Sequence, residues 1–170
     1  MVFYANPDVL DLVADIMGDA PRLADYLIAS TQRLDYVLDP VFFDNLPNEK
    51  ALEADLWGRI QRSDNFEAKL DDCVRWTNDL RFRTGVLVLR EFLTPAEGSN
   101  ALSSIADVVI RVLIPEIVTE FENRFGTIDN SSLAVLAYGK LGARELMPAS
   151  DLDLVIIYEA EEDAHSTGTN

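Results

Sequence analysis

The fold is decided by residues 133–158, which read LAVLAYGKLGARELMPASDLDLVIIY. Residues 133–138 form an unbroken apolar run of strand length, and residues 152–158 form a second run rich in β-branched and aromatic side chains. A glycine-punctuated loop joins the two runs. Because two strands do not make a stable sheet alone, we expect them to lean on helices or on further sheet partners.

The chain before this stretch has the apolar spacing of helices. Proline at positions 7 and 21 favours helix starts there, and the glycine at 126 favours a helix end. We expect helices over 7–17, 21–28, 34–38, 48–60, 66–92 and about 100–125. Residues 94–98 are interpreted as a turn, so that Ser99 or Asn100 caps the last helix, which Pro115 should kink. The sequence therefore predicts a helical bundle over about 7–125.

Periodicity also predicts which helix faces are buried. Trp57 falls beside Leu56 on the expected inner face of the 48–60 helix, and Val74 falls on the expected buried stripe of the 66–92 helix. Cys73 and Trp76 are interpreted as core residues of the same helix. We divide the chain into a helical region at 1–126, a sheet-containing region at 127–160 and a polar tail at 161–170, which we expect to be disordered.

Composition excludes several classes of protein. A formal net charge of −16 repels polyphosphate backbones, so nucleic acid is not an expected partner, whereas divalent cations are attracted. A single cysteine allows no internal disulfide, and no apolar run reaches membrane-spanning length. The first residues also lack the pattern of a secretory signal. We therefore expect a cytoplasmic protein that does not associate with membranes.

The pattern that most strongly indicates a chemical function is the carboxylate pair Asp151 and Asp153. Two positions apart on a strand, they should project from the same face while Leu152 and Leu154 face the core. Paired carboxylates repel each other unless a cation lies between them, which indicates a magnesium site. An isolated Asp-x-Asp is more often a solvated turn, so the neighbouring loop decides the interpretation.

That loop supplies groups suited to a triphosphate. Glycines at Gly139 and Gly142 let the backbone turn sharply and approach an anion, Lys140 carries a positive charge, and Ser150 adds a hydroxyl. Lys140 is equally well explained as an exposed loop lysine. Arg144 is open to two interpretations, a structural ion pair or contact with a substrate.

These residues carry a resemblance to a known family. Residues 136–146 and 150–158 resemble the signature of glutamine synthetase adenylyltransferases, which are polymerase-β-like nucleotidyltransferases, and the resemblance extends weakly to 20–25 and 81–90. It implies an α+β, mainly helical fold, with an N-terminal helical bundle followed by the first strands of an incomplete polymerase-β-like sheet. The family enzyme has two homologous halves. One transfers AMP from ATP to a tyrosine of glutamine synthetase, and the other removes it by phosphorolysis.

The resemblance assigns roles by position. It implies that Asp151 and Asp153 bind Mg2+ and are catalytic, and that the triphosphate of ATP meets Gly139, Lys140, Gly142 and Ser150. Ala143 departs from the family, which commonly has a second glycine there. The family's third carboxylate, from a later strand, has no counterpart after Tyr158. We therefore expect this chain to be a fragment with little or no activity of its own.

Three functions remain open at this point. The segments upstream of the strands resemble the adenylylating half, which regulates nitrogen assimilation with glutamine synthetase as its substrate. The adenylyl-removing half of the same enzyme is the first alternative, and a non-catalytic helical regulatory or scaffold module is the second. The family resemblance also suggests a PII signal protein as a partner.

Overall fold

The computed structural model describes residues 7–28, 37 and 39–168, and it is mainly helical. Its elements are α2 (Pro7–Asp19), α3 (Pro21–Ile28), the 3-10 helix η1 (Pro40–Phe43), α5 (Glu49–Ile60), α6 (Phe66–Leu89), α7 (Pro95–Phe125), β1 (Ser132–Ala137), α8 (Gly139–Gly142) and β2 (Leu154–Glu159). The prediction of an α+β, mainly helical fold is confirmed. The short helix expected at 34–38 lies, except for Val37, outside the described residues.

Side-chain caps fix where the longer helices begin. The Asn48 side chain accepts a hydrogen bond from the Ala51 N–H at 3.0 Å and starts α5, and Asn65 does the same for α6. The turn predicted at 94–98 is wrong, because Thr94 and Glu97 form a reciprocal capping box. Helix α7 therefore begins at Pro95, five residues before the predicted 100–125 helix, and continues through Pro115 to Phe125.

Two predicted helix faces are also wrong. Trp57 is 46% exposed and Val74 is 59% exposed, whereas Trp76 is only 3% exposed. Helix α5 buries Leu52, Leu56 and Ile60 at a spacing of four, so Trp57 falls beside that stripe. Trp76 is held in the core by its indole N–H, which donates to Asp55 Oδ2 at 2.8 Å.

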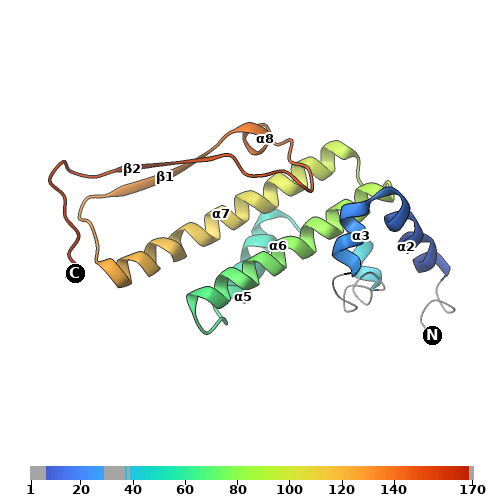
Figure 1. Cartoon of the computed structure of the whole chain (residues 1–170), viewed down its shortest axis with the longest axis horizontal. Helices are drawn as coiled ribbons and strands as arrows, with labels where there is room; N and C mark the ends of the chain where they lie inside the picture. The colour runs from blue at the N-terminus through green and yellow to red at the C-terminus, as the bar shows by residue number, and fades with distance from the viewer. Residues whose placement is uncertain (1–6, 29–36, 38, 169–170) are drawn as a thin grey trace.

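The buried side chains form two clusters. The first joins α5, α6 and α7 and includes Leu141 and Leu146 from the loop between the strands. The second joins α2, α3, η1 and α6. Cys73 is buried in the first cluster, as predicted, and burial raises the pKa of its thiol. The long helices α6 and α7 lie side by side over most of their length (Figure 1).

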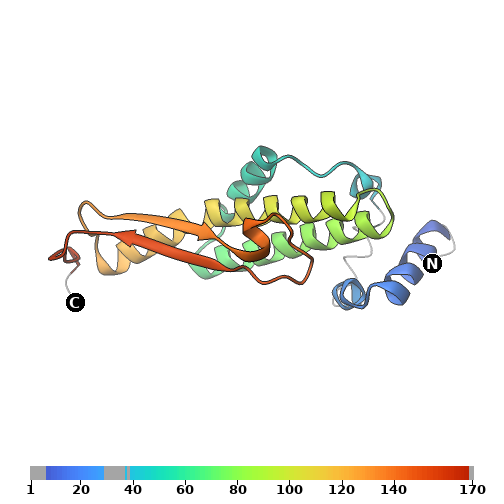
Figure 2. The same cartoon turned by 90° about the horizontal axis from the view of Figure 1, so that it is seen from above.

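The two strands form a ribbon that runs along α7 (Figures 1 and 2). They pair antiparallel, with Leu136 opposite Val155. The ribbon is poorly covered, since Ile156 is 58% and Tyr158 is 78% exposed. The chain then returns toward the end of α7, where the Thr167 N–H donates to the Thr127 carbonyl at 2.9 Å. The disorder expected for residues 161–170 stays a prediction.

The helices carry no membrane-crossing segment in the part of the chain that the structure describes. None of them combines the length and the apolar character that a transmembrane helix needs.

Candidate functional site

The predicted glycine turn is a one-turn helix that directly follows β1. Gly139 has φ of 55°, a left-handed conformation that glycine adopts freely, and it redirects the chain from β1 into α8. A side chain at Gly142 would bring its Cβ to 2.7 Å from the Ala137 carbonyl oxygen. Gly142 is therefore required by the close approach of α8 to the end of β1, and Gly139 is favoured by its left-handed φ.

Asp153 lies directly over Gly139. A Cβ built on Gly139 would fall closer to Asp153 Oδ2 than the 3.0 Å that Cβ contacts keep. The backbone holds the pair together as well, because the Tyr138 N–H donates to the Asp153 carbonyl at 2.8 Å. The structure thus brings together one of the predicted metal ligands and the predicted phosphate loop.

Asp151 and Asp153 lie just before the second strand. The predicted strand start at 152 is wrong by two residues, since β2 begins at Leu154. Leu152 lines a small cavity with Leu102 and Ile105 of α7, and the two aspartates on either side of it are exposed. The prediction that Leu152 and Leu154 face the core is wrong, because the two side chains are 41% and 38% exposed. The prediction that the two carboxylates share one face stays a prediction.

The remaining two predicted site residues differ in their surroundings. Lys140 is exposed, and no described carboxylate lies within ion-pairing distance of it. Ser150 is tied into a turn, because its hydroxyl oxygen accepts from the Met147 N–H at 3.0 Å and its own N–H donates to the Met147 carbonyl. Arg81 of α6 anchors the same turn by donating to the Pro148 carbonyl.

After α8, an arginine takes the left-handed position that glycine usually occupies at a helix end. The Arg144 N–H donates to the Leu141 carbonyl, and the Glu145 N–H donates to the Lys140 carbonyl at 2.7 Å. This pair of bonds is a Schellman motif, in which the left-handed residue is most often glycine. Here that residue is Arg144, with φ of 57°. Ala143 stays right-handed at φ of −82°, so the missing family glycine causes no strain at that position.

Arg144 forms structural contacts with α7, which decides between its two interpretations. Its guanidinium donates to Asn100 Oδ1 at 2.6 Å, to Asp107 Oδ2 at 2.8 Å and to Ser104 Oγ at 2.6 Å. A glutamate of α5, Glu49, lies 3.7 Å away. These partners are not predictable from the sequence, because nothing in the spacing of α7 relates them to a loop some forty residues later.

The donor chemistry of the site suits magnesium. Mg2+ is commonly held by one or two carboxylates together with water and substrate phosphates. Asp151 and Asp153 supply two exposed carboxylates of that kind. Within the described ranges, no group of three or more histidine, cysteine, aspartate or glutamate side chains is placed to hold a metal. The two aspartates are therefore candidate ligands, and the rest of a coordination sphere would come from other groups.

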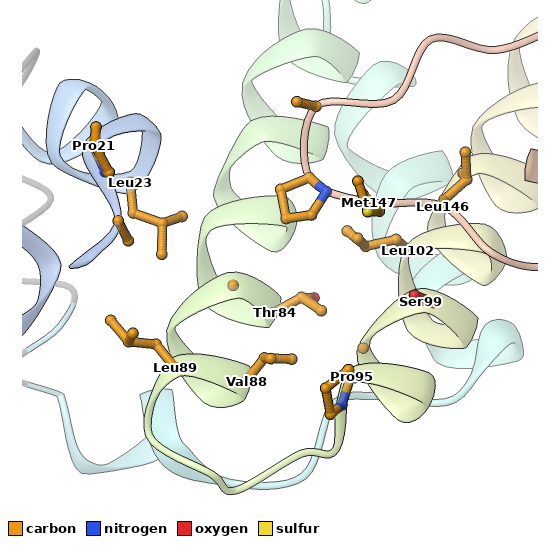
Figure 3. Close-up of a pocket in the computed structure, with 15 residues that line it drawn as sticks. Pro21, Leu23, Thr84, Val88, Leu89, Pro95, Ser99, Leu102, Leu146 and Met147 are labelled. Atoms are coloured by element: carbon orange, nitrogen blue, oxygen red, sulfur yellow. The ribbon is translucent and has the colours of Figure 1, made fainter.

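A separate apolar cavity of about 730 Å3 lies next to the loop (Figure 3). Its walls come from α3, α6, α7 and the loop, and Leu23, Val88, Leu102 and Met147 border it. No charged side chain lines it, and neither do the predicted site residues. The cavity is therefore distinct from the carboxylate site and is unsuited to a triphosphate.

The chain resembles characterised proteins over nearly its whole length. A family model described as glutamate-ammonia ligase adenylyltransferase matches residues 10–170. Three relatives carry the name bifunctional glutamine synthetase adenylyltransferase/adenylyl-removing enzyme. The protein from Xanthobacter autotrophicus is 38% identical over 95% of this chain and 16% of its own length. Those from Mesorhizobium japonicum and Brucella suis are 35% and 32% identical, each over 98% of this chain and 17% of their own length. The chain thus spans about one sixth of the relatives it matches.

Proposed function

Because the chain belongs to the glutamate-ammonia ligase adenylyltransferase family, we propose that it carries the metal-binding and nucleotide-binding part of an AMP-transferring enzyme. The proposed reaction moves AMP from MgATP to a tyrosine of glutamine synthetase. The observation that carries the proposal is the position of the Asp153 carboxylate directly over Gly139. That position joins a metal ligand to the loop that approaches the phosphates.

Each residue has a defined part in the proposal. Asp151 and Asp153 would hold Mg2+, and the ion would supply positive charge that neutralises the phosphates. Gly139 and Gly142 carry no side chain at the two ends of α8, so that an anion can approach the backbone closely there. Lys140 adds a positive charge beside the same backbone, and the hydroxyl of Ser150 keeps the turn before Asp151 in shape. Catalysis then rests on positioning and charge neutralisation.

The tyrosine hydroxyl, which is the nucleophile of the proposed reaction, needs a base that the two aspartates do not supply. Deprotonation of the tyrosine hydroxyl calls for a base within hydrogen-bonding reach. With two metal ligands and no third described carboxylate beside them, the chain should bind MgATP but turn over little or not at all. Robust AMP transfer to glutamine synthetase by this chain alone would contradict that part of the proposal.

The direction of the reaction is a separate question. The relatives' names include both adenylyl transfer and adenylyl removal, and that observation favours the removing half as the second candidate. The residues that would bind the metal and the phosphates can serve either reaction, since phosphorolysis is the transfer of AMP from the modified tyrosine to inorganic phosphate. Assaying AMP addition and phosphorolytic removal on glutamine synthetase, with the chain in its parent enzyme, distinguishes them. The proposal also includes glutamine synthetase as the protein substrate, a PII signal protein as a regulator and a cytoplasmic location.

Calorimetry on the isolated chain tests the site itself. MgATP is titrated into the wild type and into a double variant with Asp151→Asn and Asp153→Asn. A matched control replaces two exposed aspartates outside the site, Asp64→Asn and Asp71→Asn, and so removes the same charge. We expect metal-dependent binding that the site variant loses and the control keeps. No binding to the wild type, or equal loss in the control, would refute the site and favour a non-catalytic helical module.

A further inference from the structure

Arg144 holds a backbone conformation that its side chain does not favour. A left-handed φ places the Cβ of an L-residue against the following carbonyl, and glycine normally takes this place after a helix. Arg144 adopts it at φ of 57°. A non-glycine residue stays in this region only where the surrounding contacts hold it there. The side chain of Arg144 is therefore expected to make such contacts.

The contacts form a fork on one face of α7. The guanidinium reaches three side chains spaced at i, i+4 and i+7, namely Asn100, Ser104 and Asp107, all at 2.6–2.8 Å. A planar guanidinium with five donors is suited to this kind of multiple recognition, and a lysine is not. Glu49 of α5 adds negative charge 3.7 Å away. These contacts tie Arg144, two residues after α8, to α7 and α5.

The tie acts on the part of the chain that carries the site. Only Ala143 separates Arg144 from Gly142, the last residue of α8, and the Arg144 N–H is bonded to the carbonyl of Leu141. Gly139, at the other end of this single turn, lies beneath Asp153. A movement at Arg144 would therefore be passed through the single turn of α8 to the backbone beneath the Asp153 carboxylate.

We propose that Arg144 is a positioning residue, whose fork on α7 keeps α8 at the place where Gly139 lies beneath Asp153. The inference rests on the proposed function, because it assumes that this arrangement binds the triphosphate. Arg144 itself does not touch the nucleotide in this proposal. Its effect is exerted through the backbone of α8.

The test uses the whole 170-residue chain and a variant that removes the fork without straining the backbone. Arg144→Gly is suitable, since glycine is at ease at a positive φ. Arg144→Lys keeps the charge but not the fork. Arg111→Ala is the control, because Arg111 is an arginine of α7 that pairs with Glu53 and shares Glu49 with Arg144, but has no described contact with the loop. Each variant is followed by hydrogen exchange over residues 139–153, by thermal unfolding of the helices and by MgATP calorimetry.

We expect Arg144→Gly to speed amide exchange over residues 139–153 about tenfold. The same variant should weaken MgATP binding about tenfold, which corresponds to about 1.4 kcal/mol. Arg144→Lys should recover little of either, and Arg111→Ala should change neither. Helix unfolding should stay close to that of the wild type in all three. Asp107→Ala should reproduce part of the effect, and combining it with Arg144→Gly should add nothing, as expected for partners in one interaction.

Three results would overturn the inference while leaving the proposed function intact. The first is unchanged exchange in Arg144→Gly, and the second is faster exchange with unaltered MgATP affinity. Full recovery by Arg144→Lys would also overturn it, because charge alone would then suffice. If the wild type does not bind MgATP, the proposed function fails and the inference fails with it.

Discussion

Replacing Gly139 by alanine should separate the Asp153 carboxylate from the backbone of α8 while leaving the helices folded. The residue has φ of 55°, and a Cβ there would press into the Asp153 carboxylate. Either the backbone of α8 changes its path or the carboxylate moves away. Both responses take Asp153 from its place over the loop, so binding of MgATP should be lost or strongly weakened.

The magnitude follows from the backbone and the contact. The left-handed conformation costs an L-residue about 1–2 kcal/mol, and displacement of Asp153 adds to that. A cost of this size raises the population of locally opened molecules about 5–30-fold. Gly139 lies outside both buried clusters, so the unfolding temperature of the helices should change little.

Hydrogen exchange over residues 138–153, circular dichroism and calorimetry together measure these effects. Gly58→Ala is the matched control, because Gly58 lies in α5 and a Cβ there meets nothing within 4 Å. The control should stabilise α5 by about 0.5–1 kcal/mol and leave MgATP binding unchanged. The reasoning is refuted if Gly139→Ala binds MgATP as tightly as the wild type, with unaltered exchange in the loop.

Three further predictions concern stability and association. Leu56→Ala should lower the free energy of unfolding by about 2–5 kcal/mol, because Leu56 is fully buried, whereas the exposed Val74→Ala should change it by less than about 0.5 kcal/mol; urea unfolding compares them. The hydrogen bond from the Thr94 N–H lowers the pKa of Glu97, so its carboxylate stabilises α7 at neutral pH and loses that effect as the pH falls through the lowered pKa. Unfolding measured against pH should therefore show a smaller acid dependence in Glu97→Gln, and identical curves would contradict this. Ile156→Lys should reduce self-association in sedimentation experiments, because it places a charge on an exposed apolar strand with an open edge; an unchanged sedimentation coefficient across concentrations in both proteins would contradict it.

Local signals in the sequence were sufficient for most element positions. The predicted helix starts near residues 48 and 66 and the predicted helix end at Gly126 are confirmed, and the structure shows Asn48 and Asn65 as the caps of α5 and α6. The start of α7 was mistaken because Thr94 and Pro95 suit both a turn and a first helical turn. The deciding feature was Glu97, whose side chain completes the capping box.

Long-range contacts could not be derived from local patterns. Trp57 follows the buried Leu56 in sequence, yet its exposure depends on how α5 lies against α6 and α7. The Asp-x-Asp and glycine patterns predict candidate site residues but not what holds them in place. The fork of Arg144 and the anchor from Arg81 to the Pro148 carbonyl depend on helices packed against the loop from far away in sequence.

Leu141 and Leu146 join the loop to the first buried cluster, and this has a consequence for engineering. The shape of the loop depends on the surface of helices that precede it by dozens of residues. Exchanging residues 139–150 between relatives would pack Leu141 and Leu146 against helix surfaces that come from a different sequence. A functional chimera therefore has to carry the matching face of α7 with the loop, or be repacked at that contact.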